Sequence, residues 1–254
     1  MSDQPLLELK GVSKRFGAVE ALSDVNFHVS PGEVMALVGD NGAGKSTLIK
    51  GVAGIYTYDT GEIWFDSKKV SINTPSDSSA LGIEVVYQDL ALADNLDVVA
   101  NMFLGRERVR RPWRLDESSM EVACIETLKS LSVTTLNSVR QPVASLSGGQ
   151  RQAIAVAKAV MWNSRLVILD EPTAALGVAQ TAQVLALVRR LAEKGLAVVL
   201  ISHNLHDVFE AADRITVLRL GRNVSEFKTS ETNQQEVVHA ITAGKIQSVP
   251  GMMK

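Results

Sequence analysis

The amino-acid sequence predicts an α/β fold that combines a mainly parallel core sheet, an antiparallel β part near the N-terminus and an inserted α-helical subdomain. Three observations predict it: continuous apolar runs alternate with helical patterns, an earlier stretch alternates apolar and polar residues, and residues 89–162 contain few strand signals. The 254 residues, of which 46% are hydrophobic, are enough to build the core of one large domain.

Strands dominate the first third of the predicted structure. In residues 23–30, SDVNFHVS, apolar and polar residues alternate, which is typical of a half-buried strand, and the turn Pro31-Gly32 ends it. Residues 33–38, EVMALV, form an apolar run typical of a strand covered on both faces, and a glycine-rich loop and a helical pattern follow. We expect a further strand pair within residues 61–72 and a buried strand at residues 83–88.

The predicted helical subdomain covers residues 89–162, with helices over residues 116–131 and from Ser147 onward. Residues 1–88 and 163–254 are assigned to the α/β core, so that one domain spans the chain. In its second half the core is predicted to contain two strands, two helices, a hairpin and a polar helical tail. On the first of these helices one face is expected to be buried, and its apolar members are Val178, Ala182, Leu185, Val188 and Ala192.

Composition and charge exclude several classes of protein. The formal net charge of −2 provides no bulk attraction to nucleic acid, so no nucleic-acid partner is expected. The single cysteine, Cys124, excludes an internal disulfide, and the first residues lack the long apolar region of a secretion signal. The apolar runs are shorter than the roughly 20 residues that a membrane-spanning helix needs. We therefore expect a cytosolic chain that reaches a membrane only through a partner.

A glycine-rich loop is the most specific motif in the sequence. Residues 39–46, GDNGAGKS, match the spacing G-x-x-x-x-G-K-S between a predicted strand and a predicted helix. Glycines let backbone N–H groups wrap a phosphate, Lys45 supplies a positive charge for the β and γ phosphates, and Ser46 offers a hydroxyl to Mg²⁺. The predicted nucleotide-binding residues here are Gly39, Asp40, Asn41, Gly42, Ala43, Gly44, Lys45, Ser46 and Thr47.

Two acids, Asp170 and Glu171, directly follow a buried apolar run in the stretch VILDEPTAALG. A carboxylate in this position costs desolvation energy unless a cation or a reaction compensates for it. Asp170 is therefore predicted to hold Mg²⁺. If the backbone stays near-extended, Glu171 points the other way and can act as general base toward a water molecule. Taken alone, the pair could instead cap a turn and be solvated.

The segment LSGGQ, residues 146–150, lies upstream of these acids, and the order and spacing of GDNGAGKS, LSGGQ, VILDE and ISH resemble the nucleotide-binding subunit of ABC transporters over nearly the whole chain. In that family two domains pair head to tail, and each ATP lies between the phosphate loop of one and the LSGGQ of the other. The resemblance implies a P-loop NTPase of the ABC type, in which Ser147, Gly148, Gly149 and Gln150 bind nucleotide. A serine and two glycines that open a helix do supply anion-facing N–H groups.

The same resemblance implies roles for three further residues. Phe16 matches the aromatic residue that stacks on adenine, a contact that suits a flat ring. Gln88 matches a glutamine that touches Mg²⁺ and links the core to the helical insert, and His203 matches a histidine that contacts the γ-phosphate. The implied catalytic residues are Lys45, Glu171 and His203, and the implied metal ligands are Ser46, Gln88 and Asp170.

One departure from the family pattern points to a subfamily. In most members an aspartate ends the loop after the two acids and helps to connect the two ATP sites, whereas Gly177 takes that position here. This departure and residues 95–107 resemble the ATPases of bacterial importers for ribose, xylose and fructose. The resemblance implies a homodimer or a pair with a related ATPase, an integral-membrane permease, indirect contact with an external solute-binding protein, and a peripheral position on the cytoplasmic face of the bacterial inner membrane.

Two other classes of function compete with this interpretation. A soluble ABC-type ATPase that acts on DNA, ribosomes or an iron–sulfur scaffold is disfavoured by the lack of a long coiled-coil insert, a second ATPase domain and strong positive charge. An inactive ATP-binding module is disfavoured because the catalytic and metal-binding residues named above are all present. The solute itself is not encoded here, since specificity belongs to the permease and the external binding protein.

An arginine-rich run, RERVRRPWR at residues 106–114, places five arginines around Trp113. One interpretation is a solvated loop with salt bridges. The other is contact with anionic lipid or a permease, because the helical insert is expected to lie close to the membrane.

Overall fold

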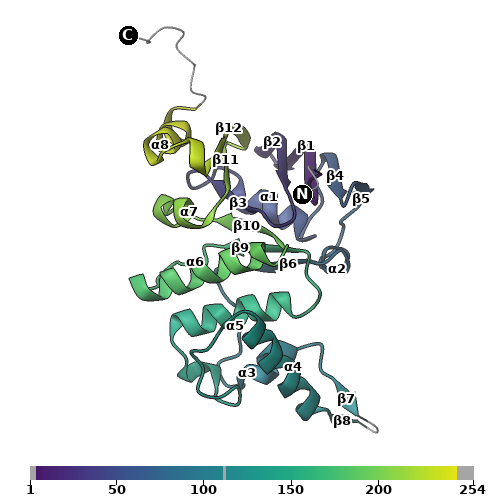
Figure 1. The fold of residues 1–254 in the computed structure, drawn as a ribbon. Helices are drawn as coiled ribbons and strands as arrows, with labels where there is room; N and C mark the ends of the chain where they lie inside the picture. Colours follow the sequence, from purple (N-terminus) through teal and green to yellow (C-terminus); the bar gives the residue numbers. More distant parts are fainter. Residues whose placement is uncertain (1–3, 111–112, 245–254) are drawn as a thin grey trace.

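The computed structural model describes residues 4–110 and 113–244. It contains a six-stranded sheet, a four-stranded antiparallel sheet and a helical subdomain that lies below the six-stranded sheet in the view of Figure 1. The predicted combination of a mainly parallel core, an antiparallel N-terminal β part and a helical insert is therefore confirmed.

The strands are β1 (Leu7–Phe16), β2 (Val19–Val29), β3 (Val34–Val38), β4 (Thr60–Phe65), β5 (Lys68–Val70), β6 (Ile83–Val86), β7 (Val109–Arg110), β8 (Arg114–Leu115), β9 (Leu166–Asp170), β10 (Ala197–Ile201), β11 (Arg214–Arg219) and β12 (Arg222–Lys228). The helices are α1 (Lys45–Val52), α2 (Pro75–Ala80), α3 (Val98–Phe103), α4 (Glu117–Ser130), α5 (Gly148–Val160), α6 (Val178–Glu193), α7 (Leu205–Ala211) and α8 (Gln234–Ala243), with short 3-10 helices at Val143–Ser145 and Thr229–Glu231.

The core sheet has the strand order β12-β11-β3-β10-β9-β6, and all neighbours except β11 and β12 are parallel. Strands β3 and β10 are buried along their whole length, as their continuous apolar runs predicted. Ile201 at the end of β10 is in register with Leu37 on β3 and with Asp170 on β9. The carboxyl ends of these three strands therefore meet at one edge of the sheet, where α/β folds bind ligands.

Two hydrophobic clusters cover the two faces of this sheet. Alternate residues of β3 point to opposite sides, so that Met35 and Leu37 join a cluster with β1, β2 and α1, whereas Val34 and Ala36 join a cluster with the helices. The second cluster continues into α3, α4 and α5 of the insert. The predicted boundaries of the helical subdomain at residues 89 and 162 stay a prediction, because the packing is continuous across them.

Two local expectations were wrong. Val178 is 90% exposed and Ala182 is also exposed, because the first turn of α6 lies at the surface and its buried stripe begins only at Val184. The insert also contains a hairpin, β7 and β8, within the arginine-rich run, where alternation over two residues per strand was too short to be recognised. Within residues 4–110 and 113–244, no helix is both long and apolar enough to cross a membrane.

Candidate active site

The glycine-rich loop connects β3 to α1, and its backbone requires glycine at two positions. Gly39 has a φ of 151°, and a Cβ atom there would lie 2.2 Å from the carbonyl oxygen of Leu218. Gly44, the N-cap of α1, has a φ of 102°. No side chain caps this helix, so the N–H groups of its first turn have no side-chain acceptor. An uncapped helix N-terminus at the end of a buried strand suits a phosphate group.

Lys45 lies across this loop. Its Nζ donates to the carbonyl oxygens of Gly39 at 2.6 Å and Asp40 at 3.0 Å. Burial lowers the pKa of the Lys45 ammonium, although the nearby carboxylates of Glu171, Asp170 and Asp40 favour its charged form. The loop therefore holds a partly desolvated cation whose present acceptors are only neutral carbonyls.

The two acids come from the end of β9. Burial raises the pKa of Asp170, and the adjacent Glu171 carboxylate raises it further, whereas Lys45 and Lys50 lower it. Glu171 has a φ of 51°, so the chain turns here, and the condition of a near-extended backbone is not met. The Glu171 N–H is fixed by the carbonyl oxygen of Ile201 at 2.9 Å. A non-glycine residue in the left-handed region is strained, which is common at functional sites.

His203 follows β10 and contacts the second acid. Its Nδ1 lies 2.8 Å from Oε2 of Glu171, whose side chain is 16% exposed, while the His203 side chain is 73% exposed. Since a carboxylate only accepts, Nδ1 carries the proton and donates it to Glu171. In the neutral imidazole this leaves Nε2 as an acceptor on an exposed ring.

A cleft of about 600 Å³ brings most of the predicted site residues together. Residues of the phosphate loop, the first turn of α1 and the two acids Asp170 and Glu171 all line it. Gln88, which follows β6 at the start of the insert, also lines the cleft. The complete lining is Val19, Glu20, Ala21, Asn41, Gly42, Ala43, Gly44, Lys45, Ser46, Thr47, Gln88, Asp170, Glu171, Ile201, Leu220 and Gly221.

The three predicted magnesium ligands all line this cleft. Ser46 contributes a hydroxyl, Gln88 an amide and Asp170 a carboxylate whose burial is not compensated by any hydrogen bond within the described residues. Oxygen ligands of this kind fit a hard divalent cation. Among residues 4–110 and 113–244, no group of three or more His, Cys, Asp and Glu side chains could hold a metal ion. A magnesium ion here would therefore depend on these oxygens together with phosphate and water.

Phe16 lies beside the cleft but does not line it. The ring is 48% exposed and packs edge-on against Tyr56, with 5.2 Å between the ring centroids. The Tyr56 hydroxyl donates to the carbonyl oxygen of Thr47 at 2.6 Å, so the aromatic pair is joined to the first turn of α1. Sequence reasoning missed Tyr56. The available signal was a pair of tyrosines, Tyr56 and Tyr58, directly after the helix that follows the phosphate loop.

The LSGGQ residues lie outside this cleft. Ser147 is the N-cap of α5 and forms a capping box with Gln150. A Cβ atom on Gly148 would lie 2.9 Å from Leu176, and one on Gly149 would lie 3.1 Å from Gln180, so this helix start packs against the region where α6 begins. None of Ser147, Gly148, Gly149 and Gln150 lines the cleft that holds Lys45. Within one chain, the two glycine-rich helix starts do not face a common ligand.

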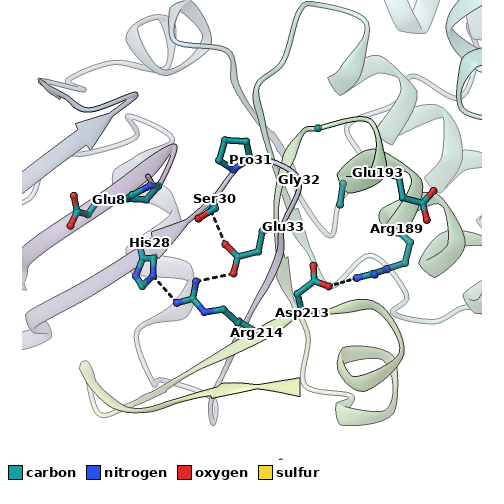
Figure 2. A pocket seen from close by; sticks show the side chains of 13 residues that line it. Glu8, His28, Ser30, Pro31, Gly32, Glu33, Arg189, Glu193, Asp213 and Arg214 are labelled. Atoms are coloured by element: carbon teal, nitrogen blue, oxygen red, sulfur yellow. Dashed lines mark hydrogen bonds and ion pairs between the residues drawn. The ribbon is translucent and has the colours of Figure 1, made fainter. Parts of the chain in front are cut away.

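A larger cleft of about 900 Å³ lies between the N-terminal sheet and the end of α6. As Figure 2 shows, several of its charged side chains bind one another: Arg214 contacts Glu33 at 2.8 Å and His28 at 2.7 Å, and Arg189 contacts Asp213 at 2.7 Å. It lacks a glycine-rich loop and an uncapped helix N-terminus. We interpret it as a junction between two parts of the fold, because both of its arginines are already paired.

Comparisons with known proteins identify the family of this chain. Residues 22–174 match the family model described as ABC transporter. The chain is 44% identical over 252 residues to the fructose import ATP-binding protein FrcA of Rhizobium meliloti, with 96% of each chain covered. It is 46% identical over 243 residues to the xylose/arabinose import ATP-binding protein XylG of Sulfolobus acidocaldarius, with 96% of this chain and 95% of the relative covered.

Solved structures show the same fold. A nucleotide-free ATP-binding cassette from an ABC transporter aligns with a TM-score of 0.81 and 25% identity over 94% of this chain and 96% of that chain. A dimeric ATP-binding cassette bound to ADP and phosphate aligns with a TM-score of 0.72 and 26% identity over 88% of this chain and 98% of that chain. The family match covers more than half of the chain and includes the whole phosphate loop and both acids. This chain belongs to the ABC transporter family, as its ATP-binding and ATP-hydrolysing cassette.

Proposed function

We propose that this chain is the ATPase subunit of a membrane importer for a monosaccharide, and that it works as one of two paired cassettes. The observation that carries the proposal is the separation of Lys45, Asp170 and Glu171, which line one cleft, from Ser147 and Gly148, which do not. A second copy, or a related ATPase arranged head to tail, would supply the missing LSGGQ. The names of the relatives, fructose import and xylose/arabinose import, support a sugar as the solute.

In the proposed reaction, water attacks the γ-phosphate of ATP. The new bond joins the water oxygen to the γ-phosphorus, the bond to the β-phosphate oxygen breaks, and ADP leaves. Glu171 accepts the proton of the attacking water as general base. His203 donates from Nδ1 to the Glu171 carboxylate and holds it in place, and in the doubly protonated imidazolium Nε2 would donate to the γ-phosphate. The strained turn at Glu171 and its N–H bond to Ile201 hold the base in place.

The remaining predicted residues hold the substrate. The loop N–H groups and Lys45 bind the β and γ phosphates, and Phe16 stacks on adenine. Mg²⁺ would be held by Ser46, Gln88 and Asp170. When bound, it neutralises charge on the phosphates and on the leaving oxygen.

The proposed assembly places the cassette pair on the cytoplasmic face of the bacterial inner membrane, bound to an integral-membrane permease. Closing of the pair around ATP and reopening after hydrolysis would drive the permease. An external solute-binding protein would deliver the sugar to the permease, without direct contact with this chain.

The proposal is tested by extracting native membranes in mild detergent with the tagged Glu171→Gln variant and ATP, followed by mass spectrometry of the bound proteins. We expect a polytopic permease in the eluate, and less of it from the same extraction without ATP. Uptake of labelled fructose, xylose and ribose by cells that have or lack this chain then identifies the sugar. Recovery of ribosomal, DNA-bound or scaffold proteins without a membrane partner would refute the transport function.

A further inference from the structure

The hairpin formed by β7 and β8 has two chemically different faces. Val109 pairs with Leu115 across the strands, and Arg110 pairs with Arg114. Because side chains alternate along a strand, the two apolar residues share one face and the two arginines share the other. Figure 1 shows that the hairpin projects from the end of the helical subdomain, away from the core sheet.

The apolar face of the hairpin is uncovered. Val109 is 70% exposed, Leu115 is 53% exposed, and Trp113 beside them is 97% exposed with a φ of 67°. A two-stranded hairpin is marginally stable in water without a covered hydrophobic face. Exposed apolar side chains grouped with a tryptophan are typical of a surface that binds something. The hairpin therefore keeps three large apolar groups where they can meet another surface.

The positive charge on the arginine face of the hairpin is not fully compensated by acids within the described residues. Arg110 and Arg114 lie directly opposite each other, and like charges in such a cross-strand pair are destabilising. Asp116 partly offsets one of them, at 3.0 Å from Nε of Arg110. Within the described residues Arg114 has no ion pair, and Arg111 lies outside them. An external anion that accepts hydrogen bonds from both guanidinium groups would relieve this repulsion.

The arginines at the base of the run have internal partners instead. Arg106 pairs with Glu84 at 3.2 Å and packs over the Trp162 ring. Arg108 donates to the carbonyl oxygen of Ser119 and packs over Phe103. Arg106 and Arg108 thus form a structural base. The tip, defined here as Val109, Arg110, Trp113, Arg114 and Leu115, has Arg110 bound to Asp116 and Arg114 with no ion pair within the described residues.

We propose that the described residues of this tip, which exclude positions 111 and 112, bind the headgroup layer of an anionic membrane. The indole of Trp113 suits the interface between headgroups and acyl chains, and Val109 and Leu115 extend the apolar contact. Arg110 and Arg114 donate to lipid phosphates, which are the bidentate acceptors that arginine prefers. Glu117 nearby shares Arg140 with Asp97 and Glu121, so it offsets part of the charge of these two arginines. This contact does not require the permease and would orient the cassette at the membrane.

Flotation of the purified full-length protein with phospholipid vesicles tests the proposal without any permease. The protein is expected to float with vesicles that contain phosphatidylglycerol, to release at high salt, and not to float with phosphatidylcholine alone. Trp113→Ala and the double variant Arg110→Glu/Arg114→Glu should each weaken binding about tenfold or more. Blue-shifted tryptophan emission on binding, absent in Trp113→Phe, would show the indole at the interface.

A matched double reversal on the N-terminal sheet, Lys68→Glu/Lys69→Glu, changes the charge equally on exposed residues and should bind vesicles like the parent protein. All variants should hydrolyse ATP like the parent, because none of these residues lines the cleft. Absence of flotation with phosphatidylglycerol, or equal flotation of parent and tip variants without the emission shift, would overturn the proposal. Loss of permease-dependent membrane retention in the tip variants, with vesicle flotation equal to that of the parent protein, would assign the hairpin to a protein contact instead.

Discussion

Helices α1 and α5 both begin beside glycines, but one N-terminus is open and the other is closed. At α1, the N-cap Gly44 provides no side-chain cap. At α5, Oγ of Ser147 accepts from the Gln150 N–H, and the Gln150 side chain accepts from the Ser147 N–H at 2.9 Å. The first helix can therefore bind an anion within one chain. At the start of the second helix, two backbone N–H groups already have side-chain acceptors. The Ser147 hydroxyl hydrogen is not used in this capping box and can donate to a group outside the chain.

The physical reason why glycine is required also differs between the two helix starts. Gly39 and Gly44 have positive φ and lie against backbone atoms that cannot move aside. Gly148 has no positive φ, and its Cβ would meet only the end of the Leu176 side chain. The contrast supports the proposal that a single chain binds ATP and that hydrolysis requires a pair of chains.

The largest expected effect is on ATP turnover at the cleft that contains the phosphate loop, and it separates turnover from ATP binding. Glu171→Gln should lower ATP turnover about 10²–10⁴-fold, because a general base is lost, while ATP affinity stays near that of the parent. Phosphate release and titration with a fluorescent ATP analogue measure the two quantities. Glu193→Gln, on α6 and away from the cleft, is the control and should change neither. Turnover at a near-parental rate would remove Glu171 from its proposed role.

The next variant acts on binding itself. Lys45→Ala removes a charge-assisted contact that contributes about 1.5–3 kcal/mol, so ATP affinity of the single chain should fall about tenfold to a hundredfold. Lys50→Ala, exposed on the same helix, should bind ATP nearly as well as the parent. Equilibrium titration of the monomer is the measurement. Equal losses in both variants would mean that net charge, and not the loop, determines affinity.

A matched glycine pair tests the comparison directly. Gly44→Ala forces an alanine to a φ of 102° and places its Cβ 2.9 Å from the carbonyl oxygen of Ala21, so it should lower the free energy of unfolding by about 1–2 kcal/mol and weaken ATP binding. Gly148→Ala should cost little stability and leave ATP binding by the single chain intact, but lower turnover. Urea unfolding, ATP titration and phosphate release measure these outcomes. If Gly148→Ala also weakened ATP binding by the monomer, the division of labour between the two helix starts would be wrong.

Much of the fold could be predicted because its signals are local. The continuous apolar runs of β3, β9 and β10 predicted a covered parallel sheet, and the motif residues at their ends predicted which edge carries the chemistry. That edge follows from parallel register alone, which aligns Leu37, Asp170 and Ile201.

The expectations that failed depend on long-range packing. The left-handed turn at Glu171 is stabilised by the Ile201 carbonyl on a neighbouring strand, which no local pattern announces. Exposure of Val178 depends on where α6 leaves the sheet, and the contact between Tyr56 and Thr47 depends on the path of the chain after α1. The roles of the site residues stay predictions.

The smallest expected effect concerns the aromatic pair Phe16 and Tyr56, which is joined to the start of α1. Tyr56→Phe keeps the edge contact with Phe16 but loses the bond to Thr47, so the KM for ATP should rise about fivefold with kcat unchanged, as expected for a net contribution of about 1 kcal/mol. Tyr58→Phe is a matched control, because its hydroxyl also donates to an α1 carbonyl, that of Leu48, without contacting Phe16. It should lower stability without raising the KM. A change in kcat for Tyr56→Phe, or an equal rise in KM for both variants, would show that both tyrosines only support α1. The Phe16 ring, which is proposed to stack on adenine, would then not be joined to the phosphate loop through Tyr56.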